Sequence, residues 1–218
     1  VPSFNDDKLL IVHACGSTDP SRSHFDAQRF MEVGLANEPQ LGTGWLGRHL
    51  AGVPPMVPGA GLRGVGISTG LQRTLVGAPS TLPIPDLDAF GLAGAAGTIP
   101  ARTDALGDMF GLVSDPLRAA GLNTIATIAL LNTINFSGYV PGGGAVYPGG
   151  GVGTAFRSVA ALIKAQVGVE AIAIDISGWD THNNQGVLGA GTMAGLMATL
   201  AQALAAFYAD MNSGMNPG

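Results

Sequence analysis

The sequence predicts an α/β fold with a mostly parallel sheet. Two continuous apolar runs have the length of buried strands, residues 8–14 (KLLIVHA) and residues 169–176 (VEAIAIDI). A helical pattern follows each run, so that strand, helix, strand and helix alternate along the chain. Because 218 residues are enough for one sizeable core, we expect residues 1–218 to form a single α/β domain.

Composition narrows the classes of function. Charged residues make up only 11% of the chain, yet no apolar run reaches the roughly 18–20 residues of a membrane span, so we expect none. The net charge is −5 and the only lysines are Lys8 and Lys164, so no basic patch is visible and we expect no nucleic-acid partner. A low-charge, glycine-rich chain is typical of an exported, periplasmic or extracellular protein. The single cysteine, Cys15, cannot form an intramolecular disulfide, and we expect it to be buried after the first apolar run.

The first half of the chain has clear helix boundaries. Ser23 is a candidate N-cap for a helix over residues 24–33, which Gly34 would end. A short helix is predicted within residues 42–52. A further strand is predicted at residues 64–69.

Loops rich in glycine and proline separate the next predicted helices. Residues 76–100 should be mostly loop. Helices are predicted at residues 103–111 and 115–135, the second with Pro116 at its first helical position. Residues 138–153 form a glycine-rich loop that lacks the GK[ST] of a phosphate-binding P-loop.

The last third repeats the pattern of helix, strand and helix. Residues 154–167 predict an amphipathic helix. Asp175 interrupts the strand at residues 169–176 and would need a partner if it were buried. Residues 186–211 predict a long helix, and its Met residues are expected in the core rather than in a ligand set.

Ligands of open α/β sheets bind beyond the carboxyl ends of the strands. Residues 16–26 (GSTDPSRSHFD) follow the first predicted strand, and residues 178–185 (GWDTHNNQ) follow the later one. Both segments are rich in Asp, His, Ser and Thr. Their shared place in the predicted fold indicates a functional site.

Asp180 and His182 lie two residues apart in the second segment. From one loop, a carboxylate and an imidazole can converge on a divalent cation, and zinc accepts both ligand types. The alternative is that Asp180 caps the following turn and His182 is a solvated loop residue. Spacing alone favours this alternative, because D-x-H is a weak pattern.

The first segment suits anion chemistry. At the start of a helix, Ser21 or Ser23 would lie in positive potential beside free N–H groups, where a hydroxyl could attack a phosphate or sulfate group. Arg22 could clamp that anion. Thr18 stands at the nucleophile position of the loose sulfatase pattern C/S/T-x-P-x-R. The alternative is an ordinary N-cap with a surface arginine.

Four segments of the sequence resemble successive blocks of a single protein family. These segments are residues 9–34 (LLIVHACGSTDPSRSHFDAQRFMEVG), 44–50 (GWLGRHL), 159–186 (VAALIKAQVGVEAIAIDISGWDTHNNQG) and 200–211 (LAQALAAFYADM). These blocks resemble the bacterial domain-of-unknown-function family numbered fifteen-oh-one, within the alkaline-phosphatase/sulfatase-like superfamily. The resemblance runs nearly end to end, and SRSHFDAQ and GWDTHNNQ are its most specific parts.

The resemblance implies a three-layer α/β/α sandwich and export through a twin-arginine signal that is later removed. It also implies hydrolysis of small phosphate or sulfate esters with two metals, usually zinc. By this resemblance the metal ligands are Asp180 and His182, the nucleophile is Ser21 or Ser23, and Arg22 is an anion clamp. His24 and Asp26 are further candidates for the metal site.

The chain also departs from the family pattern. The family's earlier Gly-rich, Asp-containing strand and its later EFGRT-like and DHG-like segments are missing. We therefore expect a partial family domain, truncated at both ends, or a variant that cannot complete a two-metal site. The leading hypothesis is a metal-dependent hydrolase. The alternative is a non-catalytic exported binding or structural protein, whose low charge and glycine-rich loops suit self-association.

Overall fold

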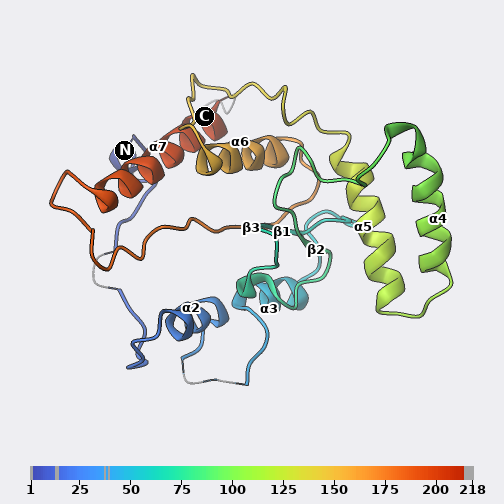
Figure 1. Ribbon diagram of the computed structural model, residues 1–218, viewed down its shortest axis with the longest axis horizontal. Helices are drawn as coiled ribbons and strands as arrows, with labels where there is room; N and C mark the ends of the chain where they lie inside the picture. The colour runs from blue at the N-terminus through green and yellow to red at the C-terminus, as the bar shows by residue number, and fades with distance from the viewer. Residues whose placement is uncertain (1, 13–14, 37, 39, 214–218) are drawn as a thin grey trace. The chain divides into compact units, whose positions relative to one another are not determined.

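Seven α-helices and a small three-stranded parallel sheet form the described part of the chain, which is residues 2–12, 15–36, 38 and 40–213 of a computed structural model (Figure 1). The α/β class is therefore confirmed. The chain divides into two compact units. The terminal unit comprises Val1–Gly16, Gly138–Ala165 and Ile174–Gly218, and the central unit comprises Ser17–Ser137 and Gln166–Ala173.

The sheet has the strand order β2-β1-β3. Its members are β1 (Gly64–Ile67), β2 (Thr81–Pro83) and β3 (Ala171–Ile174). β1 and β2 run parallel, with Val65 opposite Leu82. The strands predicted within residues 64–69 and 169–176 are confirmed, although each is shorter. β2 was not predicted, because three residues ending in proline are too few to show a strand pattern.

The strand predicted at residues 8–14 is wrong over its described part, residues 8–12, which form no strand. Leu10 is 82% exposed instead of buried. An apolar run favours burial, but a strand forms only where a neighbouring segment satisfies its backbone hydrogen bonds. His13, which was expected inside this strand, lies outside the described residues. Cys15, which was expected to be buried, is exposed.

α2 (His24–Val33) has the ends that the sequence predicts. The side chain of Ser23 caps it by accepting a hydrogen bond from the backbone N–H of Asp26. Gly34 ends the helix in a left-handed conformation with φ 74°, which glycine adopts without steric cost. The short helix predicted within residues 42–52 is α3 (Trp45–Gly52).

α4 (Ile99–Gly111) and α5 (Leu117–Leu131) lie side by side in the central unit (Figure 1). They confirm the two helices predicted in this part of the chain. Pro116 is the N-cap of α5 rather than its first helical residue, which corrects the predicted start. Two short 3₁₀ turns, η1 (Arg73–Leu75) and η2 (Ala96–Thr98), precede these helices.

A small apolar core holds the sheet region of the central unit together. Leu50 of α3, Leu75 of η1 and Ala171 of β3 are buried against one another. Burial of such side chains removes apolar surface from water, which is the main driving force for folding. These residues are far apart in sequence, so their contact is a product of the tertiary fold.

An ion pair beside this core links residue 63 to residue 170. Nε of Arg63 lies 2.7 Å from Oε1 of Glu170, and the side chains are only 5% and 8% exposed. Nη1 of Arg63 also donates to the carbonyl oxygen of Leu50 at 2.8 Å. The hydrogen bond from Arg63 lowers the pKa of Glu170, so the pair stays charged.

In the terminal unit, α6 (Gly151–Lys164) packs against α7 (Thr192–Asn212), and α1 (Pro2–Asn5) contacts α7. The rings of Phe156 and Phe207 meet edge to face, with centroids 5.8 Å apart and planes at 78°. Both helices were predicted, and each begins at a different residue from the one expected.

α7 begins at Thr192 because residues 186–191 form a turn instead of the predicted first helical turns. Its methionines, Met193, Met197 and Met211, were expected in the core but are all at least partly exposed. By length and composition, α7 is the one helix among the described residues that could cross a membrane. The core helix of a soluble protein meets the same criterion, so a chain without a membrane span stays a prediction.

Candidate functional site

Asp180 and His182 contact each other in the loop that follows β3. Nε2 of His182 lies 2.7 Å from Oδ1 of Asp180, and the side chains are 67% and 59% exposed. The backbone N–H of Asn184 donates to the carbonyl oxygen of Thr181 at 2.7 Å, which closes a tight turn around His182. Asp175 is exposed just after the strand, so it needs no buried partner. The D-x-H pattern thus brings its two side chains together.

The donor types of this pair fit a zinc ion. In a tetrahedral zinc site with bonds of about 2.0–2.1 Å, two ligand atoms lie about 3.3 Å apart. The 2.7 Å contact would therefore have to open by about 0.6 Å, which two exposed side chains can do. A second arrangement would keep the contact: Asp180 would orient the ring, and His182 would hold the ion through Nδ1. Either way, further ligands must complete the coordination, because two ligands are fewer than zinc requires.

Ser21, Ser23 and Asp26 form a second polar group at the start of α2. The Ser21 hydroxyl donates to Oδ2 of Asp26 at 3.1 Å and accepts from the backbone N–H of Ser23 at 3.1 Å. The Ser23 hydroxyl accepts from the backbone N–H of Asp26 at 3.3 Å. The Ser23 hydroxyl therefore serves as the N-cap of α2. Ser21 is the serine whose hydroxyl proton meets a carboxylate, as a base-assisted nucleophile requires.

The other candidates of this segment are exposed. Thr18, Arg22 and His24 all lie on the surface around the start of α2. The argument that residues 16–26 follow a buried strand is wrong, because the described residues before them form no strand. The same argument is confirmed for residues 178–185, which follow β3. The serine group belongs to the central unit, and the Asp180–His182 pair belongs to the terminal unit.

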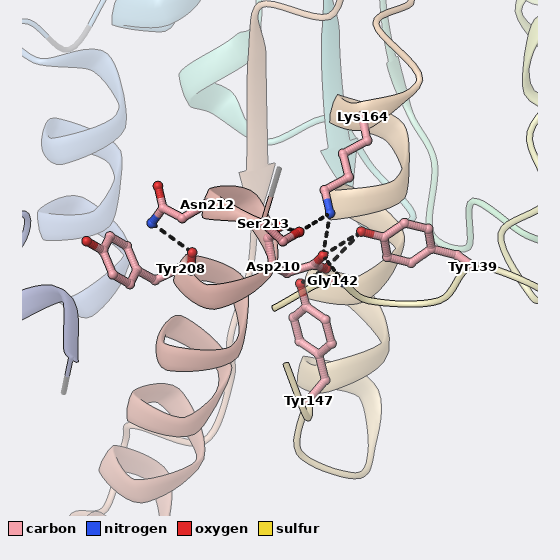
Figure 2. A network of polar contacts seen from close by, with 8 residues as sticks. All are labelled: Tyr139, Gly142, Tyr147, Lys164, Tyr208, Asp210, Asn212 and Ser213. Atoms are coloured by element: carbon pink, nitrogen blue, oxygen red, sulfur yellow. Dashed lines mark hydrogen bonds and ion pairs between the residues drawn. The ribbon is translucent and has the colours of Figure 1, made fainter. Parts of the chain in front are cut away.

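Sequence reasoning missed Asp210, whose side chain accepts hydrogen bonds from several groups of the terminal unit (Figure 2). Its carboxylate is fully buried. Oδ1 accepts from Nζ of Lys164 at 2.6 Å and from the backbone N–H of Gly142 at 2.7 Å. The hydroxyl of Tyr147 donates to Oδ2 at 2.7 Å, and that of Tyr139 contacts both oxygens at 2.8 and 2.9 Å.

This network shifts the pKa values of its members. Burial by itself would raise the pKa of Asp210, but the hydrogen bonds from Lys164, Gly142, Tyr147 and Tyr139 outweigh it and lower that pKa. Burial likewise opposes the charge of Lys164, and its hydrogen bond to Asp210 nevertheless raises its pKa. The pair therefore remains charged at neutral pH. It ties the glycine-rich loop to α6 and α7 (Figure 2).

The sequence signal for this network is weak but present. Asp210 is the one charged residue among residues 183–211, and Lys164 ends α6. A lone carboxylate in an apolar helix must find partners if it is buried. Which partners it finds depends on how the two helices pack.

Comparisons of the chain with protein-family models, with curated proteins and with solved structures found no match. The resemblance to the alkaline-phosphatase/sulfatase-like superfamily therefore remains a hypothesis that the quoted sequence blocks carry.

Proposed function

We propose that the chain is part of an exported metal-dependent hydrolase of the alkaline-phosphatase/sulfatase type, acting on small phosphate or sulfate esters. The observation that carries this proposal is the contact between Asp180 and His182, 2.7 Å apart in a loop after a strand of a parallel sheet. Loops at this edge of α/β sheets are where such proteins bind ligands. The α/β class is compatible with the superfamily's sandwich.

The proposal gives a role to most of the candidate residues and none to Thr18 and His24. Asp180 and His182 would hold a divalent cation, most simply zinc, which lowers the pKa of a bound hydroxyl and stabilises anionic charge when it is present. Ser21 is the candidate nucleophile, because its hydroxyl donates to the carboxylate of Asp26. Ser23 holds the start of α2 in place. Arg22 would bind an ester anion.

The second candidate function is a non-catalytic exported protein that binds metal. The exposure of the Asp180–His182 pair favours it, because the side chains are 59% and 67% exposed. Sites that turn over esters usually exclude water around the reacting groups. The two functions share the metal and differ in turnover, so they can be separated by experiment.

The first experiment measures metal. Purified protein is loaded with zinc, desalted and assayed by elemental analysis, and the affinity is measured by competition with a chromogenic chelator. We expect stoichiometric zinc in the wild type and its loss in Asp180→Ala and His182→Ala. The matched controls are Asp175→Ala and His49→Ala, which also remove exposed side chains. Equal zinc content in all five proteins would refute the metal site.

The second experiment measures turnover. The zinc-loaded wild type is assayed with p-nitrophenyl phosphate and p-nitrophenyl sulfate. A hydrolase loses turnover in Ser21→Ala while its zinc content is unchanged. If zinc binds and neither ester is hydrolysed, the non-catalytic function is favoured. If turnover survives Ser21→Ala, the assignment of Ser21 as nucleophile is wrong.

A further inference from the structure

A groove of about 470 Å³ opens in the terminal unit between the turn at residues 185–189 and the first turns of α7. Its walls are carbon-rich, with Met193, Ala194 and Met197 contributed by the helix. The volume lies within the roughly 300–1,000 Å³ of pockets that bind small molecules. Methionine side chains are flexible and polarizable, so they adapt to the shape of a ligand.

The turn that forms one wall is held in place by backbone hydrogen bonds. The N–H of Ala190 donates to the carbonyl oxygen of Val187 at 3.0 Å, and the N–H of Met193 donates to that of Gln185 at 3.1 Å. Gly186 and Gly191 have φ values of 88° and 98°, a region that other residues rarely adopt. The hydrogen bonds and the two glycines define the shape of this wall before any ligand arrives.

Large apolar side chains are exposed around the groove. Val187 is 76% exposed, Leu188 is fully exposed and Met197 is 53% exposed. A cluster of exposed apolar side chains around a concave surface marks an interaction site more often than single ones do.

The lining of the groove offers no counter-charge to an ionic ligand. Residues 183–209 contain no charged residue, and no charged side chain lines the groove. The cationic side chains of the unit are Lys8, Arg157 and Lys164. Lys164 binds Asp210, and Arg157 donates to the carbonyl oxygen of Tyr139 at 2.7 Å. An anionic headgroup would therefore find no counter-charge among the groove's lining residues.

We propose that this groove binds an uncharged small molecule that has an alkyl or aryl body and one hydrogen-bonding group. The apolar walls take the body of the ligand. Gln185, whose side chain is the one polar side chain among the lining residues, supplies a donor and an acceptor for its polar group. The proposal goes beyond the metal-dependent function and does not rest on it.

The test is a fluorescence titration with N-phenyl-1-naphthylamine, a neutral aromatic probe, carried out in EDTA so that metal plays no part. We expect saturable binding to the wild type. Met193→Gln and Met197→Gln should each raise the Kd by about fivefold or more, because each replaces an apolar wall with a polar side chain. Ala194→Leu, which fills the groove, should abolish binding.

Met109→Gln is the matched control, since Met109 is 63% exposed on another helix, α4. Gln and Met have similar helix propensities, so circular dichroism should be unchanged in all three Met variants. The proposal is overturned if the wild type shows no saturable binding. It is also overturned if the Kd is unchanged in the groove variants, or if Met109→Gln weakens binding as much as they do.

Two further arms test the class of ligand. 1-Anilinonaphthalene-8-sulfonate carries the same ring system with a negative charge, and we expect it to bind more weakly than the neutral probe. Equal or tighter binding would overturn the preference for an uncharged ligand. Analytical ultracentrifugation would reveal a dimer if the groove instead receives a second copy of the chain. A dimer that is lost in Met197→Gln would replace the small-molecule proposal.

Discussion

Replacing Asp210 with asparagine removes the buried charge on which Lys164, Tyr139 and Tyr147 converge. The side chain keeps its shape, so the change tests the charge rather than the packing. One oxygen remains as an acceptor. The new amide group cannot accept the hydrogen bonds that now reach the other oxygen.

The expected cost follows from the burial of the two partners. Removing one member of a buried ion pair costs about 3–5 kcal/mol, because the other charge loses its partner. Asp210 is fully buried, whereas the side chain of Lys164 is 31% exposed and can regain some hydration. We therefore expect the lower end of that range, a loss of about 3 kcal/mol in the free energy of unfolding.

Urea denaturation, followed by circular dichroism at neutral pH, measures this loss. The matched control is Asp175→Asn, which neutralises an exposed carboxylate just after β3 and should change the free energy of unfolding by less than about 0.5 kcal/mol. A loss below about 1 kcal/mol for Asp210→Asn would show that the buried charge contributes little, and would refute the reasoning.

The stability difference between the wild type and Asp210→Asn should also depend on pH. The pKa of Asp210 is lower in the folded protein than in the unfolded chain. Its stabilisation is therefore fully present above the unfolded pKa of about 4 and is lost as the pH falls through the folded pKa. The stability difference between wild type and Asp210→Asn should be constant from pH 7 to pH 5 and shrink below about pH 4. A difference that grows on acidification would contradict this assignment.

Two further predictions concern the packing of α4 against α5 and the cap of α2. Gly121→Ala should lower the free energy of unfolding by about 1–3 kcal/mol, because a Cβ there would meet the ring of Phe110. Gly107→Ala, where a Cβ meets nothing, should raise it by up to about 1 kcal/mol, and equal effects of the two would contradict the contact between α4 and α5. Ser23→Ala should cost about 1 kcal/mol by removing the cap of α2, and Ser23→Asp should restore most of it. Urea denaturation measures both, and no rescue by Asp would argue against the cap.

Local features of the chain could be predicted from the sequence because their causes are local. Ser23 and Gly34 bracket α2, since a capping hydroxyl and a left-handed glycine act on the nearest residues. Asp180 and His182 meet because they are two residues apart in one turn. Their contact needed no knowledge of the rest of the fold.

Predictions from the sequence were wrong where a feature depends on residues far away in the chain. Residues 8–12 have the composition of a buried strand, but they form no strand, because a strand depends on a neighbour that the run itself cannot specify. The argument for a site at residues 16–26 depended on that strand. The same argument holds for Asp180 and His182, since the strand before them, β3, does pair in the sheet.

The sequence by itself determined the α/β class, the ends of α2 and the proximity of Asp180 to His182. Only the tertiary structure decided that Arg63 pairs with Glu170 and that Lys164 and the two tyrosines converge on Asp210. The physical reason is the range of the interactions involved. A cap or a turn is satisfied within a few residues, whereas a buried charge is satisfied by whichever groups the packed helices and loops bring to it.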